Sequence, residues 1–354
     1  MNKNAVRRNG LLKKIRRKVE QSGLDAFLVT GERDIFYLTG YFCEKAKLLI
    51  AAGRAVYFID SMNEALGRKM LKDLELGEII AGQVNAKLKD FIRTGRIRRI
   101  GINEKNLSVS EYKSLSDKTS LKFRHLPSLI EDMRCVKQEY EIGLLRKAAR
   151  ETVRVWREVR KNIEKGMSEK DIADMINVLI RALGHENAFS PVVAIGENTA
   201  YPHAIPGSRR LKEGEHLLVD FGVRVEGYCS DLTRTYSVGR IDRKIREFRT
   251  LVHRAHDLAI ETVKPGVKTG SLGERINRYF INNNVDGNLI LHGLGHGVGL
   301  DIHERPFFRE ECSEPLRKGM VITIEPGLYK GGVGGIRKED TVLVTAKGCE
   351  VLTV

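Results

Sequence analysis

Two aspartates stand in one apolar, strand-like segment, residues 217–238, which reads LLVDFGVRVEGYCSDLTRTYSV. A hairpin with a symmetric turn would pair Asp220 with Thr233. It would also place Asp220 and Asp231 on one face of the sheet, about 7–8 Å apart. Two buried carboxylates repel each other unless a cation lies between them or an arginine, for which Arg234 is a candidate, pairs with one. We therefore predict a metal site at this hairpin.

Histidines are concentrated in a second, glycine-rich segment, LHGLGHGVGLDIHERP at residues 291–306. His292 and His296 have the i, i+4 spacing of a helical zinc motif, but the alternating glycines oppose a helix and no glutamate follows the first histidine. Such glycines suit a strand or loop whose backbone approaches other groups closely. With His303 in the same segment, we interpret it as functional. Another histidine, His203, is held in the proline-rich loop YPHAIP.

Two further acidic positions lie beside apolar runs near the C-terminus. Glu325 ends the run VITI and precedes a Pro-Gly turn, a place where a side chain can be presented to a site. Glu339 and Asp340 open another apolar run. Because side chains alternate along a strand, only one of the two faces the core, and the pattern alone does not say which.

Together these segments resemble those of the M24 metallopeptidases: aminopeptidase P, prolidase and, more distantly, methionine aminopeptidase. The motifs VDFG, SDLTRT, GHGVG, TIEPG and a C-terminal Glu-Asp-Thr occur in the order of that family. The resemblance covers essentially the whole chain and includes the stretch DIFYLTGY in the N-terminal half. It implies five metal ligands, which are Asp220, Asp231, His296, Glu325 and Glu339.

The resemblance also implies a role for each of these residues. Asp220 would hold one metal ion, and His296 and Glu325 would hold the other. Asp231 and Glu339 would bridge both. The substrate pocket would be lined by His203, His292, His303 and Arg337. Four carboxylates and one imidazole match two divalent ions, and we expect Mn²⁺, with Co²⁺, Zn²⁺ and Fe²⁺ as alternatives.

The implied chemistry is hydrolysis of the peptide bond that precedes a proline. Two metal ions lower the pKa of a shared water, so a metal-bound hydroxide would attack the carbonyl. Glu325 would pass the proton to the proline nitrogen, His303 would stabilise the oxyanion and His203 would orient the substrate. We expect an Xaa-Pro aminopeptidase acting on peptides with proline at the second position. The alternative is an Xaa-Pro dipeptidase (prolidase). A remote alternative is a non-catalytic binding protein on the same fold, which would be expected to have lost ligands.

The elements that must position these residues differ between the two halves. Residues 1–128 alternate between helical and strand-like patterns and predict a small α/β domain. Residues 129–354 predict an α+β domain, which the resemblance identifies as the "pita-bread" fold. The predicted strands of the first domain are 24–30, 47–60 and 98–103, and its helices are 61–75, 84–94 and a first helix with Leu11, Leu12, Ile15 and Val19 on one face. The predicted helices of the second domain are 137–165, 168–183, 241–263 and 269–282.

Composition limits the remaining possibilities. The 354 residues are 42% apolar and 30% charged, as in an ordinary folded chain, and no apolar run approaches the length of a membrane span. Five widely spaced cysteines and the lack of a secretory signal favour a cytoplasmic protein. The net charge of +15 is compatible with nucleic acid, but the basic residues are dispersed and aromatics are only 6%. We therefore expect no nucleic-acid or membrane partner, and the resemblance implies a homodimer.

Overall fold

The computed structural model of the chain describes residues 3–117, 121–126, 129–309 and 311–354. The chain divides into two compact units, Met1–Met133 and Arg134–Val354. The division falls within helix α6 (Leu129–Cys135), and residue 128, where the sequence led us to expect the boundary, lies outside the described residues. None of the helices described combines the length and the apolar character needed to cross a membrane.

The first unit is built on a six-stranded sheet with the strand order β4-β3-β2-β1-β5-β6. Its strands are β1 (Ala26–Val29), β2 (Lys47–Ala51), β3 (Ala55–Ile59), β4 (Glu78–Ala81), β5 (Arg99–Ile102) and β6 (Lys122–His125). Its helices are α1 (Lys3–Gln21), α2 (Glu32–Thr39), α3 (Glu64–Leu71), α4 (Val84–Thr94) and α5 (Val109–Ser116), with a short 3-10 turn η1 (Glu104–Asn106).

Side chains alternate between the two faces of a strand. Strands β1 and β3 are apolar and buried on both faces, so helices cover the sheet. Leu88 and Ile92 of α4 and Leu115 of α5 pack in one core cluster with strand residues such as Leu28 and Phe58. Helix α1 contacts β1 and β2, and its predicted apolar face is buried. The α/β class expected for this half is confirmed, although α2, α5, β4 and β6 were not predicted.

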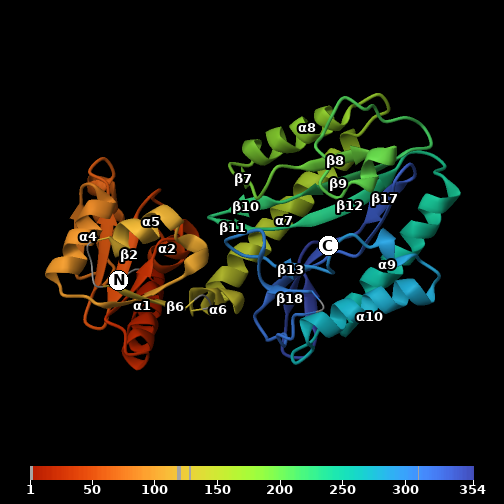
Figure 1. The fold of residues 1–354 in the computed structure, drawn as a ribbon. Coiled ribbons are helices and arrows are strands. Elements are labelled where there is room, and N and C mark those ends of the chain that lie inside the picture. The colour runs from red at the N-terminus through yellow and green to blue at the C-terminus, as the bar shows by residue number, and fades with distance from the viewer. Residues whose placement is uncertain (1–2, 118–120, 127–128, 310) are drawn as a thin grey trace. The chain divides into compact units, whose positions relative to one another are not determined.

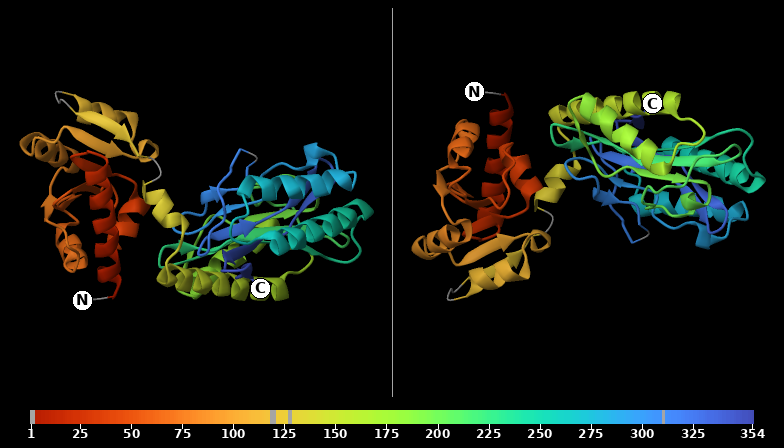
Figure 2. Two further views of the ribbon diagram at one scale, coloured as in Figure 1. Left: turned by 90° about the horizontal axis from the view of Figure 1, so that it is seen from below. Right: turned by 90° about the horizontal axis from the view of Figure 1, so that it is seen from above.

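The second unit packs short sheets between two pairs of helices (Figures 1 and 2). Helices α7 (Glu139–Asn162) and α8 (Glu169–Ala182) lie on one side of the strands, and α9 (Arg243–Thr262) and α10 (Thr269–Asn282) lie on the other. Ser168 and Asp171 form the predicted N-terminal cap of α8. The 3-10 turns are η2 (Gly196–Ala200) and η3 (Gly287–Leu289).

The strands described in this unit form four small sheets. Their strand orders are β11-β10-β7, β12-β9-β8, β14-β13-β15-β18-β19 and β16-β17. The strands are β7 (Glu186–Asn187), β8 (Val192–Ile195), β9 (His216–Phe221), β10 (Val223–Val225), β11 (Tyr228–Cys229), β12 (Leu232–Ser237), β13 (His296–Gly297), β14 (Glu304–Phe307), β15 (Val321–Ile324), β16 (Gly327–Lys330), β17 (Gly334–Arg337), β18 (Asp340–Val344) and β19 (Cys349–Val351).

The predicted hairpin has the expected register. Asp220 pairs with Thr233 where β9 meets β12, and Val225 pairs with Tyr228 where β10 meets β11. The ladder is interrupted at Gly222, where the two halves of the hairpin join different sheets. Asp231 therefore lies between β11 and β12, outside the strand in which it was predicted.

Candidate metal centre

A cavity of about 410 Å³ in the second unit is lined by every ligand and pocket residue that the resemblance implied. The five candidate ligands and the four candidate pocket residues are Asp220, Asp231, His296, Glu325, Glu339, His203, His292, His303 and Arg337. Apolar side chains complete the wall, and they include Phe189, Val192, Pro202, Ile302 and Phe307. Segments that are far apart in sequence thus converge on one space.

Asp231 is placed by a threonine from another strand. Its backbone N–H donates to Thr341 Oγ1 at 3.2 Å, and the same hydroxyl donates to the Asp231 carbonyl at 2.8 Å. These bonds replace the ladder bonds that the hairpin would have supplied. They explain how a residue outside a regular strand is still held rigidly at the cavity.

The glycines around His296 permit close backbone contacts, as the sequence predicted. A Cβ on Gly295 would overlap the carbonyl oxygen of Thr323, and one on Gly297 would overlap that of Arg305. The segment is not helical, because β13 pairs with β14 and β15 here. His296 is thereby carried on a strand in the middle of its sheet.

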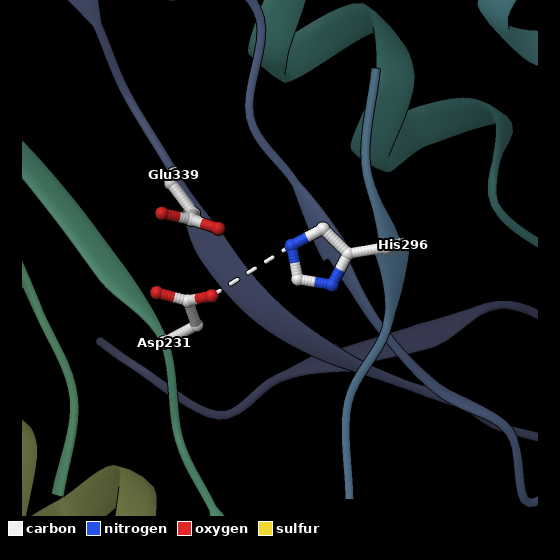
Figure 3. Close-up of side chains that lie close together, drawn as sticks. All are labelled: Asp231, His296 and Glu339. Atoms are coloured by element: carbon white, nitrogen blue, oxygen red, sulfur yellow. Dashed lines mark ion pairs between the residues drawn. The ribbon is translucent and has the colours of Figure 1, made fainter. Parts of the chain in front are cut away.

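Asp231, His296 and Glu339 point toward one another from different strands and loops (Figure 3). One candidate ligand atom from each lies within 4.8 Å of those of the other two. His296 Nε2 is 3.7 Å from Asp231 Oδ2 and 3.5 Å from Glu325 Oε1. The three side chains are thus close enough together to hold one metal ion.

Of the two adjacent acids at the N-terminal end of β18, Glu339 lines the cavity. Asp340 instead accepts a hydrogen bond from Arg234 at 2.6 Å and lies 3.0 Å from His256 Nε2. Arg234 is therefore not the partner of the hairpin aspartates that we considered from the sequence.

The hydrogen bonding of His296 favours one tautomer. Its Nδ1 lies 3.1 Å from the Gly297 carbonyl oxygen, which can only accept, so we assign the proton to Nδ1. Burial, followed by the neighbouring His303, lowers the pKa of His296 to about 3, so the ring is neutral. Its Nε2 lone pair then faces carboxylate oxygens, an arrangement that repels unless a cation lies between them.

Ionising the carboxylates of the site costs free energy, because they are buried close together. Burial raises the pKa of Glu325 to about 8, with Arg337 opposing the rise and Asp220 adding to it. Burial raises the pKa values of Asp231 and Glu339 well above the ordinary range, and nearby carboxylates raise them further. A divalent cation among these oxygens would remove that cost.

Unpaired oxygens provide the test of whether metal ions fit. Within the described part of the chain, Asp220 Oδ1, Asp231 Oδ1 and Glu339 Oε1 are buried and have no hydrogen-bond partner. Buried polar atoms normally have one. Three such oxygens at one cavity, beside an imidazole lone pair, match the ligands that hard divalent ions prefer.

Arg337 ties the carboxylates to the rest of the site. It is 3% exposed and donates to Asp220 Oδ2 at 2.6 Å, to Thr233 Oγ1 at 3.0 Å and to Tyr329 Oη at 2.9 Å. The Thr233 hydroxyl in turn donates to Glu339 Oε2 at 2.7 Å. The sequence reasoning missed Thr233 and Tyr329, since nothing in their spacing separates them from core residues.

Tyr329 also fixes His292. His292 Nδ1 lies 2.8 Å from the Gly293 carbonyl, so it carries the proton, and Nε2 accepts from Tyr329 Oη at 2.7 Å. Burial, followed by the charge of Arg337, lowers the pKa of His292 to about 4. Both ring nitrogens are thus already engaged within the protein.

His203 and His303 are the exposed histidines of the cavity. The His303 ring meets the His296 ring edge-on, with 4.3 Å between their centroids. Partial burial, followed by the neighbouring His203, lowers the pKa of His303. A neutral imidazole at this place still carries one N–H that can donate to a ligand.

Arg309 is a lining residue that the sequence did not point to. It lies in the loop between β14 and β15, is exposed, and has its guanidinium 5.7 Å from the centre of the Phe307 ring. Among the described residues, no carboxylate forms an ion pair with it. No motif flanks it, so only the folded structure could identify it.

The two units match two different family models. Residues 143–346 match the model described as metallopeptidase family M24, and residues 12–136 match that of the creatinase/prolidase N-terminal domain. The Xaa-Pro dipeptidase of Pyrococcus horikoshii is 31% identical to this chain, over 98% of this chain and 97% of its own length.

Solved structures show the same similarity. The Xaa-Pro dipeptidase from Bacillus anthracis has a TM-score of 0.91 and 28% identity, and covers 99% of this chain and 97% of its own. The X-Pro aminopeptidase from Thermotoga maritima has a TM-score of 0.85 and 30% identity, and covers 95% of this chain and 97% of its own.

Proposed function

Because the chain belongs to metallopeptidase family M24, we propose that this hydrolase is a metal-dependent Xaa-Pro dipeptidase. The sequence motifs first suggested an Xaa-Pro aminopeptidase, with the dipeptidase as its alternative. Relatives named as Xaa-Pro dipeptidases, from Pyrococcus horikoshii and Bacillus anthracis, support the alternative better. A non-catalytic binding protein is disfavoured because all five candidate ligand side chains line one cavity.

Arg309 is the residue that favours a dipeptide over a longer peptide as the substrate. An Xaa-Pro dipeptide has a free carboxylate on the residue that follows the scissile bond, whereas a longer peptide has an amide there. Arginine binds carboxylates with two parallel hydrogen bonds. An exposed guanidinium at the same cavity as the candidate ligands, with no ion-pair partner among the described residues, supports recognition of that carboxylate.

The candidate ligands would hold two divalent ions. Asp220 would serve one ion, His296 and Glu325 the other, and Asp231 and Glu339 both. Four carboxylates balance the charge of two such ions, and the oxygen-rich set supports Mn²⁺. When bound, the ions would polarise the scissile carbonyl and lower the pKa of water.

The protein's own groups would supply the remaining steps. Glu325 would take a proton from the attacking water and deliver it to the proline nitrogen, which must be protonated to leave. His303 would donate its N–H to the oxygen that becomes negative, and His203 would orient the substrate. His292, whose nitrogens are both engaged, would shape the pocket with its ring.

Hydrolysis of Ala-Pro beside Ala-Pro-Ala, with Mn²⁺ added and a chelated sample as control, tests this proposal. We expect cleavage of the dipeptide alone. The similarity to the Thermotoga maritima X-Pro aminopeptidase makes that activity the second candidate, and release of alanine from Ala-Pro-Ala would establish it. If neither peptide is cleaved while Mn²⁺ is bound, both candidate activities are contradicted. The expected homodimer stays a prediction, and a sedimentation measurement can test it.

A further inference from the structure

Strands β13 and β14 form a hairpin that carries four of the residues lining the cavity. His296 lies at its start, Ile302 and His303 in its loop, and Phe307 at its end. His296 is paired with Phe307, with a bulge at the next position. The position of His303 therefore depends on how firmly this hairpin is held.

Glu304, the residue after His303, is held by two buried cations from the start of the second unit. Lys137 Nζ lies 2.8 Å from Glu304 Oε1, and Arg134 Nη2 lies 2.6 Å from Glu304 Oε2. Arg134 Nη2 also lies 2.6 Å from Asp301 Oδ2, on the other side of His303. The two cations thus hold both flanks of the loop that presents His303.

The two ion pairs of Glu304 are shielded from water, whereas the Asp301 side chain is 43% exposed. The Lys137 side chain is 1% exposed, that of Arg134 8% and that of Glu304 10%. Burial alone would raise the pKa of Glu304, but Lys137 and Arg134 outweigh it and the pKa is lowered. Two positive and two negative groups also make the cluster neutral, so removing one member leaves a buried charge uncompensated.

The backbone is shaped around the Glu304 carboxylate. A Cβ on Gly299 would overlap Glu304 Oε1, so the loop closes tightly over this carboxylate. The Gly299 carbonyl also accepts a hydrogen bond from the Cys229 N–H at 2.7 Å, two residues before Asp231. Lys137 is itself anchored, since its N–H donates to the Gly319 carbonyl at 2.9 Å.

A role in stability alone is the competing explanation. Buried ion pairs add little net stability, but they specify one arrangement of the groups they join. The pair of Arg146 and Glu350 joins α7 to β19 in the same unit, without bordering a lining residue. The Lys137–Glu304 pair differs because Glu304 directly follows His303.

We propose that Arg134 and Lys137 are positioning residues, which act through Glu304 and Asp301 to fix the loop that presents His303 to the substrate. This proposal rests on the proposed function for the role of His303. It also predicts that these ion pairs order the loop locally, and this prediction does not depend on the activity of the protein.

A double-mutant cycle tests the proposal. Lys137→Met is made in the wild-type chain and in His303→Ala, and Glu304→Gln, which keeps the side-chain shape, is made in both as a second variant. Lys161→Met is the matched control, since Lys161 is an exposed α7 lysine 3.4 Å from Glu158. We expect Lys137→Met to lower kcat for Ala-Pro by up to about 100-fold with little change in KM, because small misplacements of a reacting group are costly. In His303→Ala we expect a further loss below about threefold. An equal loss in both backgrounds, or none beyond that of the control, would overturn the proposal.

Hydrogen exchange provides the readout that separates failure of this proposal from failure of the proposed function. Amides of residues 298–304 should exchange at least about tenfold faster in Lys137→Met than in Lys161→Met, while those of α9 and α10 are unchanged. Unchanged exchange in 298–304, or faster exchange throughout the unit, would overturn the positioning role even if the chain proves inactive on Xaa-Pro peptides.

Discussion

Arg337 Nη2 lies 2.6 Å from Asp220 Oδ2, although the two residues are 117 positions apart in the sequence. The other hydrogen bonds of this buried guanidinium go to Thr233 and Tyr329. Arg337 is thus committed to the groups that surround the candidate ligands, and its charge opposes the raised pKa of Glu325. Its contribution to substrate binding would be made through these groups.

Arg337→Lys should therefore impair metal binding as well as hydrolysis. Lysine keeps the charge but cannot reach three partners in one plane. We expect Mn²⁺ affinity to fall about 10- to 100-fold, the usual cost of losing a group that orients a ligand. Calorimetric titration of Mn²⁺ measures this, with the exposed Arg160→Lys as control. Wild-type affinity in Arg337→Lys would contradict the orienting role.

Asp231→Asn should lower the activity of the protein and raise the stability of its metal-free form. Replacing one of four crowded carboxylates removes repulsion, so the metal-free variant should unfold with a free energy about 1 kcal/mol higher than that of the metal-free wild type. Hydrolysis of Ala-Pro should fall by at least about 100-fold, because Asp231 would bridge both ions. Urea unfolding and steady-state rates measure the two effects, with the exposed Glu158→Gln as control. Full activity would eliminate Asp231 as a ligand.

The metal-free protein should lose stability as pH rises from 7 to 8.5. The folded pKa of Glu325 is raised to about 8 from an ordinary 4.5, and those of Asp231 and Glu339 are raised as well. The folded state then binds more protons than the unfolded state, so the free energy of unfolding falls as pH rises. The histidines whose folded pKa is lowered oppose this trend only weakly, because unfolded histidine, with a pKa near 6.5, is already mostly neutral at pH 7.

Mn²⁺ should reverse the loss of stability with rising pH, because it replaces the protons on the carboxylates. The rise in unfolding temperature on adding Mn²⁺ should be larger at pH 8.5 than at pH 7, and differential scanning calorimetry measures it. Glu325→Gln should weaken the pH dependence of the metal-free protein. A metal-free protein that becomes more stable between pH 7 and 8.5 would refute this account of the carboxylates.

Arg309→Gln should raise KM for Ala-Pro by about 10-fold or more, with kcat less affected, since a charge-assisted hydrogen bond to the substrate carboxylate is lost. Ala-Pro amide, which lacks that carboxylate, should be cleaved with the same KM by both proteins. Arg317→Gln is the matched control, because Arg317 is exposed in the same loop but pairs with Glu314. An equal effect on the acid and the amide would exclude Arg309 as the carboxylate anchor.

Local patterns were sufficient to predict most elements and the candidate ligands. The helix predicted at 84–94 is α4, and that at 269–282 is α10, because apolar periodicity is a local signal. The hairpin register followed from the symmetry of its turn, and the pairing of Asp220 with Thr233 confirms it. Helix α2 was missed because its sequence ERDIFYLT is rich in β-prone side chains.

Contacts between distant segments could not be predicted in the same way. Lys137 and Glu304 are 167 positions apart, and neither belongs to a motif that suggests the other. Asp231 was predicted to lie in a strand. The sequence pattern does not reveal that its backbone is hydrogen-bonded to Thr341 of β18 instead. Arg309 has no local signature at all, since an exposed loop arginine is ordinary until the fold places it at a cavity.

Titration of the chelated protein with Mn²⁺, while Ala-Pro cleavage is followed, tests the central claim most directly. We predict no cleavage by the chelated protein and full activity once two ions are bound per chain. Two bound ions with Ala-Pro left intact, or cleavage by the protein while it is free of metal, would contradict it.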